Sequence, residues 1–171
     1  NVRLGYYKNE EENKKVFNED GWLLTGDIGE FTPDGFLKIT DRKKELFKTS
    51  GGKYVAPAPI ENKLKESFFI EQIALEGDGE KYISALIIPN FDNLKEWAKK
   101  HDISFLSNKE LIENQQVKQF YKDIVTEFNV NFGKVEQIKH FELLADEWTV
   151  ENGLLTATMK LRRKVLKEKY K

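Results

Sequence analysis

Residues 70–90, IEQIALEGDGEKYISALIIPN, contain two apolar runs separated by Asp78-Gly79. An Asp-Gly pair in this position is a strong signal for a β-hairpin, because glycine readily takes the positive φ that a tight turn requires. The stretch therefore predicts two antiparallel strands.

Helical patterns lie on both sides of this hairpin. Before it, PAPIENKLKESF (57–68) begins with two prolines, which the first helical turn tolerates, and continues with apolar residues at helical spacing that end with Phe68. After it, NLKEWAKKH (93–101) is predicted helical, and SNKE (107–110) matches a capping box before a helical stretch to about residue 128. A further strand is predicted for IKHFELL (138–144).

The two ends of the chain extend this α+β pattern. Residues 9–21 predict a short surface helix that ends at Asp20-Gly21, and residues 22–40 predict two strands around the turn TPDG (32–35). MKLRRKVLKEKY (159–170) predicts a basic amphipathic helix with Leu161, Val165 and Leu166 on its inner side. An internal boundary is expected near Asp41, where strands give way to a mixed series.

The composition is that of a soluble globular chain, with 39% apolar and 33% charged residues among 171. A net charge of −1 gives no global field for nucleic acid or an anionic membrane, so a polyanion site must be local. The absence of cysteine excludes disulfides and thiolate chemistry, and two unrelated histidines argue against a His-based metal site. No apolar run approaches the ~20 residues of a membrane-spanning helix. The start, NVRLGYYKNE, indicates a piece of a longer protein.

A dense group of cations stands beside two glycines in DRKKELFKTSGGKYVAP (41–57), which holds four lysines and one arginine. Arg42 offers a planar fork for phosphate or ribose, and Lys44 and Lys48 offer point charges. The TSGG stretch (49–52) offers hydroxyls and unobstructed backbone N–H groups that a phosphate or a narrow ligand chain can approach. The alternative interpretation is a solvated hairpin with a flexible tip, and the spacing is not that of a Walker loop.

Two further positions carry candidate chemistry. Asp27 follows a glycine in TGD (25–27), where a carboxylate can accept both hydroxyls of a ribose; a simple turn is the alternative. Lys160 stands at the predicted start of the tail helix, where the helix dipole disfavours a cation. This electrostatic cost points to an anion bound near Lys160. The alternative is that Lys160 is one more cation on a solvent-exposed helix face.

Taken together, residues 21–61 and the tail NGLLTATMKLRRK (152–164) resemble the C-terminal part of the adenylate-forming enzymes, with long-chain fatty acid–CoA ligases as the most similar branch. The resemblance covers essentially the whole chain. It implies a ligase that uses ATP and Mg²⁺ to convert a fatty acid to an acyl-adenylate and then transfers the acyl group to CoA. Residues 1–41 would be the last strands of the large adenylation domain, and residues 42–171 a mobile C-terminal lid domain.

The resemblance also implies roles for the first half-reaction. Asp27 would bind the ribose hydroxyls of ATP and AMP, and Arg42 would contact the nucleotide. Lys160 would be the catalytic residue that bridges the acid carboxylate and the α-phosphate, where a placed cation stabilises developing charge. Asp41 would be the hinge about which the lid turns between the two reactions.

The roles implied for the second half-reaction fall on the cationic stretch. Lys44 and Lys48 match the family's charged positions after the hinge, and Lys48 matches a lysine of CoA transfer. Ser50, Gly51 and Gly52 would swing in to line the tunnel for the pantetheine arm of CoA. This chain would supply no metal ligand of its own.

The sequence also departs from the full family pattern. The phosphate loop, the acyl pocket and the metal-coordinating acid of the large domain are absent, so Mg²⁺ would be bound mainly by the missing N-terminal domain. The chain is therefore expected to be inactive alone, with that domain as its partner. The tail reads GLLTATMK where a proline and a Ser-Gly pair are common in the superfamily. This difference resembles the long-chain branch.

Two other interpretations stay open. One is an adenylating ligase for another carboxylic acid, or one that loads a carrier protein instead of CoA. The other is a non-enzymatic interaction module that docks through the basic helix at 159–171, whose signature would be a salt-sensitive affinity for DNA or lipid. For the ligase, fatty acid, ATP and CoA are the expected ligands and nucleic acid is not. A cytoplasmic location with peripheral membrane contact suits its poorly soluble acid.

Overall fold

The computed structural model describes residues 5–42 and 45–170, without the side chains of residues 40–42. It divides into two compact units, Asn1–Leu46 and Phe47–Lys171. Helices and strands occur in both units, which confirms the α+β class. Among the described helices, none is long and apolar enough to span a bilayer.

The first unit begins with a short helix. α1 (Glu10–Val16) starts after Asn9, whose side-chain oxygen accepts the N–H of Glu12 at 3.1 Å. The helix predicted for residues 9–21 is therefore present, but it ends earlier than Asp20-Gly21. The reason is that Phe17 is extended and forms an antiparallel bridge with Leu23.

An antiparallel hairpin completes the first unit and confirms the strands predicted for residues 22–40. It pairs β1 (Asp27–Phe31) with β2 (Leu37–Arg42). The N–H of Thr32 donates to the carbonyl of Phe36 at 2.8 Å, and Gly35 takes the φ of 82° that the turn requires. Among residues 5–39, 45 and 46, whose side chains the structure describes, none is buried. Its large exposed apolar side chains include Trp22, Leu24, Phe31, Phe36, Leu37 and Ile39.

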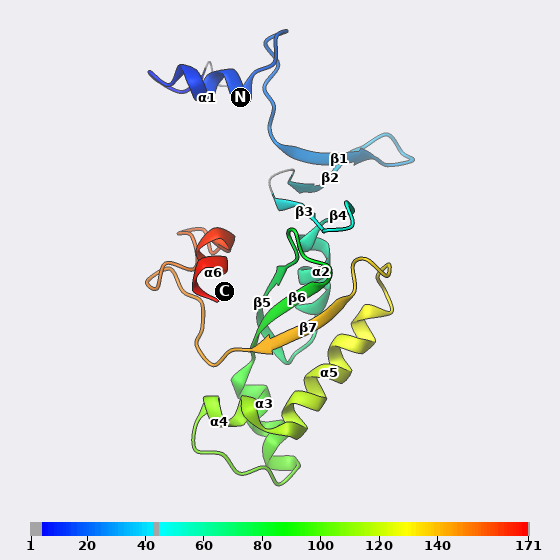
Figure 1. Cartoon of the computed structure of the whole chain (residues 1–171), viewed down its shortest axis with the longest axis vertical. Coiled ribbons are helices and arrows are strands. Elements are labelled where there is room, and N and C mark those ends of the chain that lie inside the picture. Colours follow the sequence, from blue (N-terminus) through cyan, green and yellow to red (C-terminus); the bar gives the residue numbers. More distant parts are fainter. Residues whose placement is uncertain (1–4, 43–44, 171) are drawn as a thin grey trace. The chain divides into compact units, whose positions relative to one another are not determined.

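The second unit is built on a three-stranded sheet with the order β5-β6-β7 (Figure 1). β5 (Ile70–Glu76) and β6 (Ile83–Pro89) form the antiparallel hairpin that the Asp-Gly pair predicts, and Gly79 has a φ of 76°. β7 (Ile138–Leu143) pairs with β6 in parallel. Parallel neighbours need a crossover connection, which is usually helical.

Three helices form that crossover: α3 (Phe91–Lys100), α4 (Asn108–Glu113) and α5 (Gln115–Asn129). α4 begins at the predicted cap, because Ser107 Oγ accepts the N–H of Glu110 at 3.2 Å. The Glu110 carboxylate completes the cap one residue earlier than a capping box does, since it accepts the N–H of Leu106 at 2.7 Å.

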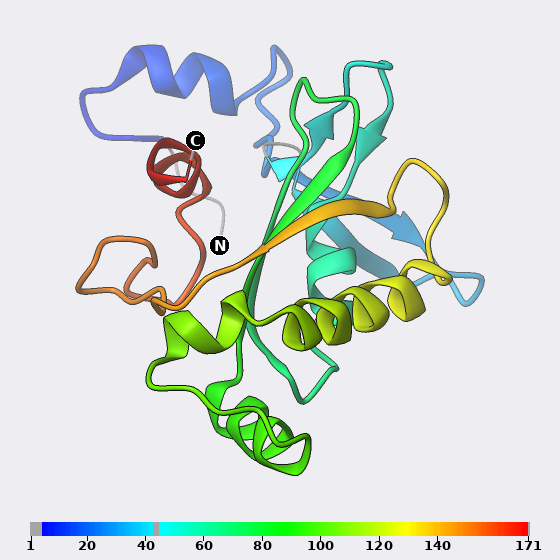
Figure 2. The same ribbon diagram turned by 60° about the horizontal axis from the view of Figure 1, so that its bottom comes forward.

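Both faces of the sheet are covered, which explains why its strands are apolar without clean alternation. α2 (Pro57–Leu64) and α5 pack on one face, where Ile73 and Leu75 belong to the larger core cluster. The segment from Leu144 to α6 (Arg163–Lys169) covers the other face, with Ala74 in a second cluster (Figure 2). That second cluster comprises Ala74, Ile88, Leu144, Trp148, Leu154, Leu155 and Leu166.

Two predicted helix ends differ from the structure. α2 ends at Leu64, so Phe68 lies outside the helix and is 84% exposed rather than packed. The tail helix begins at Arg163, not at Met159, because Leu161 pairs with Leu155 in an antiparallel bridge. Of the predicted inner residues of the tail, Leu166 is fully buried, whereas Leu161 and Val165 are partly buried against the second cluster.

Candidate functional site

Lys160 lies in a closed turn three residues before α6, which corrects its predicted place at a helix start. The N–H of Thr156 donates to the carbonyl of Lys160 at 2.8 Å, and the N–H of Lys160 donates to Thr156 Oγ1 at 3.1 Å. Between them, Met159 holds a φ of 59°. The backbone of Lys160 is thus fixed on both sides while its side chain is exposed. The helix-dipole argument does not apply, because the dipole acts within the first helical turn.

The predicted Ser-Gly-Gly segment forms the turn of a second hairpin, between β3 (Phe47–Lys48) and β4 (Tyr54–Val55). Thr49 is buried, and its Oγ1 donates to the carbonyl of Lys53 at 3.1 Å. Gly52 has a φ of 75°, a backbone conformation that residues with a side chain rarely adopt. A Cβ built at Gly51 would meet only Thr49 Oγ1, at 4.0 Å. The turn therefore presents open backbone, and Ser50 beside it is exposed.

This turn is held against the β5–β6 hairpin by backbone contacts. The N–H of Ser50 donates to the carbonyl of Glu80 at 3.0 Å, and the N–H of Gly79 donates to the carbonyl of Lys48 at 2.9 Å. Asp78 Oδ1 accepts the N–H of Lys48 at 3.2 Å. The Lys48 ammonium is exposed and lies 5.8 Å from the ring centroid of Tyr54. The glycine turn is accordingly hydrogen-bonded into the second unit.

A buried ion pair joins the tail to the core of the same unit, and the sequence interpretation missed it. Arg163 Nη1 and Nη2 donate to the two carboxylate oxygens of Glu61 at 2.8 and 2.7 Å. The same carboxylate accepts the N–H of Leu75 at 2.7 Å. The Arg163 guanidinium also lies 5.9 Å from the ring centroid of Phe47 in β3. A single arginine therefore contacts both the helix α2 and the strand that leads into the glycine turn.

The predicted nucleotide residues lie in the first unit. The register pairs Asp27 with Arg42 and Ile28 with Asp41 across β1 and β2. Asp27 is exposed, and its N–H donates to Thr25 Oγ1 at 3.1 Å. Pairing thus brings Asp27 and Arg42 to opposite positions, about 5 Å apart in a sheet of this kind. The side chains of Arg42 and of the predicted hinge Asp41 lie outside the described atoms.

Lys44, the remaining predicted cation, lies outside the described residues. The predicted roles of all these residues, including the hinge at Asp41, stay predictions. In the described part of the chain, no three His, Asp or Glu side chains are grouped so as to hold a metal ion.

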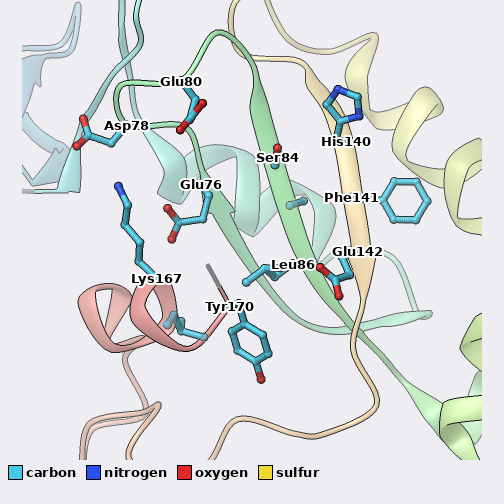
Figure 3. A pocket seen from close by; sticks show the side chains of 12 residues that line it. Glu76, Asp78, Glu80, Ser84, Leu86, His140, Phe141, Glu142, Lys167 and Tyr170 are labelled. Carbon is cyan, nitrogen blue, oxygen red and sulfur yellow. The ribbon is translucent and has the colours of Figure 1, made fainter.

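A cavity of about 370 Å³ was not predicted; it lies between the sheet and α6 (Figure 3). Four of its twelve lining residues are acidic, namely Glu76, Asp78, Glu80 and Glu142, and Lys167 reaches toward it from α6. Burial raises the pKa of Glu76 above its ordinary value, although Lys167 and Arg163 act in the opposite direction.

Comparison with known proteins gives a consistent set of relatives. No family model matches the sequence. The chain is 38% identical over 174 residues to rat (Rattus norvegicus) long-chain-fatty-acid–CoA ligase 6, and the match covers 100% of this chain but 25% of that protein. The chain thus spans about a quarter of the length of the curated relatives that it matches.

Solved structures share the fold. The adenylation domain of a carboxylate reductase from Mycobacterium chelonae matches with a TM-score of 0.79 and 31% identity, over 98% of this chain and 24% of that chain. The A-PCP didomain of a carboxylic acid reductase from Segniliparus rugosus, solved in complex with AMP, matches with a TM-score of 0.74 and 28% identity, over 98% of this chain and 22% of that chain. Homology over the whole chain and a shared fold establish that this chain belongs to the adenylate-forming enzymes and is a homologue of one quarter of a long-chain fatty acid–CoA ligase.

Proposed function

We propose that this chain is the C-terminal part of an ATP-dependent long-chain fatty acid–CoA ligase, with the second unit as a mobile lid. The observation that carries the proposal is the 38% identity over the entire chain to a protein of that activity. The placement of the Lys160 turn and the Gly51-Gly52 turn within one compact unit supports it. A body that presents two different turns can serve two successive reactions.

In the first half-reaction, Lys160 would contact the acid carboxylate and the α-phosphate as they approach each other. Negative charge accumulates on oxygens of both groups, and a cation that is already in place stabilises that arrangement without reorganisation. The hydrogen bonds between Lys160 and Thr156 support this role, because they fix the backbone from which the ammonium extends. Asp27 and Arg42 of the first unit would hold the ribose and the nucleotide.

In the second half-reaction, the turn at residues 50–52 would face the narrow pantetheine arm of CoA. The glycines leave their backbone uncovered, so a thin ligand chain can pass close to the N–H groups. Rotation about Asp41 would exchange one turn for the other at a single reaction centre. ATP and CoA are the substrates in this proposal, and Mg²⁺ would be bound by the N-terminal domain.

The N-terminal domain is also the proposed partner of the first unit. That unit exposes several large apolar side chains, of which Trp22 is 73% and Phe31 78% exposed. Exposed apolar patches of this kind mark interaction surfaces. The absent strands of the adenylation domain would cover them.

The test uses the parent protein with its upstream sequence restored, and compares Lys160→Ala with Lys164→Ala. Both lysines are exposed cations of the tail, so Lys164 controls for general charge. Acid-dependent exchange of labelled pyrophosphate into ATP reports adenylation, and thioester formation from a preformed acyl-adenylate reports the second step. We expect exchange to fall by about 10²-fold or more in Lys160→Ala alone, with the second step retained. Unchanged exchange would assign Lys160 to the surface cations.

A second candidate function is the loading of a carrier protein with an activated acid. The TM-scores of 0.79 and 0.74 with the two reductase domains favour it, since one of these is the A-PCP didomain. Supplying the parent with either free CoA or a phosphopantetheinylated carrier protein distinguishes the two functions. Thioester on CoA alone supports the ligase, and thioester on the carrier alone supports the second candidate.

The interaction-module interpretation has weaker support. Its basic helix, α6, has only the residues Arg163–Lys169, and Leu166 within it is fully buried in the second core cluster. Trp148 Nε1 donates to the Tyr170 hydroxyl at 3.3 Å just beyond the helix. The apolar side of α6 is thus occupied inside the unit and does not offer a docking face.

A further inference from the structure

The tail segment that carries Lys160 is attached to the second unit by apolar contacts and by an ion pair. Leu154, Leu155 and Leu166 are buried in the second core cluster. Burial of apolar surface is favourable but has no preferred direction, so these leucines hold the tail against the sheet without fixing its orientation. A bidentate pair between a guanidinium and a carboxylate does have a fixed geometry, and Arg163 supplies one shortly after Lys160.

The carboxylate that receives Arg163 is itself held on two sides. Glu61 belongs to α2 and is 5% exposed, and its Oε1 accepts the N–H of Leu75 in β5 at 2.7 Å. The helix and the sheet therefore fix the acceptor, and the tail must meet it where it lies. A lysine in place of Arg163 would keep the positive charge but would lose the planar fork that matches both oxygens.

The Arg163 guanidinium also contacts the strand that leads into the glycine turn. It lies 5.9 Å from the ring centroid of Phe47, which is 6% exposed in β3. A cation at this distance from an aromatic ring is attracted to it. The ring also packs against the end of β5, since a Cβ built on Gly77 would lie 3.4 Å from Phe47 Cδ2. Because Phe47 is followed directly by Lys48 and Thr49, the position of its ring sets where the glycine turn begins.

Each of the two turns is closed by its own hydrogen bonds and so keeps its shape when its attachment shifts. The backbone of Lys160 is bonded to Thr156 through both its N–H and its carbonyl. In the glycine turn, the N–H of Thr49 donates to the carbonyl of Lys53 at 2.9 Å, and the N–H of Gly52 donates to the carbonyl of Thr49 at 2.8 Å. A shift of the attachment therefore moves a whole turn relative to a substrate. A misplacement of ~1 Å can lower a rate about 10²-fold.

We propose that Arg163 is a positioning residue for both half-reactions. Its pair with Glu61 sets the place of the Lys160 turn for adenylation, and its contact with Phe47 sets the place of the glycine turn for transfer to CoA. The inference rests on the proposed ligase function, which gives the two turns their successive tasks. It predicts that a change at Lys160 impairs one half-reaction, whereas a change at Arg163 impairs both.

The experiment compares Arg163→Lys with Arg162→Lys in the parent protein. Arg162 is the matched control, because its guanidinium is exposed and its Nη1 donates to the carbonyl of Gly153 at 3.2 Å. Pyrophosphate exchange and thioester formation from a preformed acyl-adenylate are followed separately, well below the melting temperature of each variant. We expect Arg163→Lys to lower the kcat of both steps roughly three- to tenfold. The KM for ATP and the KM for CoA should stay within about twofold of wild type, because a positioning residue does not itself contact the substrates.

A second variant, Phe47→Leu, separates the two contacts of Arg163 and serves even if Arg163→Lys is too unstable to purify. Leucine keeps an apolar side chain in the core but removes the ring beside the guanidinium, while the pair with Glu61 remains. We expect thioester formation to fall about threefold and pyrophosphate exchange to stay unchanged. Phe128→Leu in α5 is the control, since Phe128 packs against the same core cluster.

This proposal and the proposed function fail in different ways. If the wild-type parent shows no acid-dependent pyrophosphate exchange and no thioester formation, the proposed function is wrong. If both steps proceed in wild type but Arg163→Lys has wild-type kcat values and only a lower melting temperature, the pair is merely structural and the positioning proposal alone is overturned. Loss of exchange alone in Arg163→Lys, or wild-type thioester formation in Phe47→Leu, would overturn the link to the glycine turn.

Discussion

Glu61 is a buried carboxylate whose hydration is replaced by three hydrogen bonds. Its side chain is 7% exposed, against 21% for the side chain of Arg163, and the third donor is the N–H of Leu75. A buried charge is tolerated only when it is paired and hydrogen-bonded, which this geometry provides. The pair links α2, β5 and the start of α6, so one residue contributes to the position of the whole tail.

We expect Glu61→Gln to lower the free energy of unfolding by about 2–4 kcal/mol, because the amide leaves the Arg163 guanidinium without its buried counter-charge. The control is Lys63→Gln in the same helix, which breaks an exposed ion pair with Glu66 just beyond the helix end and should cost about 0.5 kcal/mol or less. Urea unfolding of the 171-residue chain gives both values. Equal losses of unfolding free energy in the two variants would mean that the buried Glu61–Arg163 pair stabilises the fold no more than the exposed Lys63–Glu66 pair does.

The raised pKa of Glu76 predicts how the stability of the fold depends on pH. Burial raises its pKa in the folded state above the ordinary value of 4.5, so the folded state binds more protons than the unfolded state just above that pH. Stability from this group is therefore present below about pH 4.5 and is lost as the pH rises through the raised pKa. We expect Glu76→Gln to melt at most a few degrees higher than wild type at pH 7 and at the same temperature at pH 4. A lower melting temperature of the variant at pH 7 would show that the attraction of Lys167 outweighs burial.

At the scale of elements, the tail turn shows how a short segment can fix the backbone of an exposed lysine without a helix. Leu154 and Leu155 are buried, Leu161 pairs with Leu155, and the N–H of Arg162 donates to the carbonyl of Leu154 at 2.9 Å. These contacts close the loop that carries Lys160. The Thr156 hydroxyl is the side chain that contacts the Lys160 backbone.

We expect Thr156→Val in the parent protein to lower pyrophosphate exchange about three- to tenfold, since valine keeps the shape but cannot accept the Lys160 N–H. Thioester formation from a preformed acyl-adenylate should not change. Thr158→Val is the control, because it removes the hydroxyl contact between Thr156 and Thr158 but leaves the Lys160 backbone held. A similar loss of exchange in both variants would argue against a positioning role for Thr156.

The sequence predicted the elements whose signals are local. The Asp-Gly hairpin, the Thr-Pro-Asp-Gly turn and the cap at Ser107 each depend on a few neighbouring residues, and the structure confirms all three. The predicted start of the tail helix at Met159 was wrong. The sequence pattern at 159–162 is typical of a helix, but Leu161 pairs with Leu155 across a turn, and no local pattern indicates that pairing. Glu61 was missed for a related reason: its partner Arg163 lies 102 residues away, and no local pattern connects them.

At the scale of the whole molecule, the buried residues are unevenly distributed. Among the residues whose burial the structure describes, the core runs from Phe47 to Leu166, and none before Phe47 is buried. The core starts at the β3–β4 hairpin, where Phe47 and Val55 join the larger cluster. The free energy of burial therefore belongs to the second unit, whereas exposed large apolar side chains occur in both units.

This distribution predicts that residues 47–171 fold as an independent domain. We expect this fragment to unfold in urea in one cooperative transition, with the same midpoint and m-value as the 171-residue chain, because the m-value follows the surface exposed on unfolding. The comparison is a fragment of residues 57–171, which lacks the β3–β4 hairpin and with it the buried Phe47 and Val55. Losing two buried apolar side chains should cost several kcal/mol, so the shorter fragment should unfold at a much lower urea concentration. If the 47–171 fragment is as unstable as the 57–171 fragment, residues before Phe47 contribute to its stability, and the second unit does not fold independently.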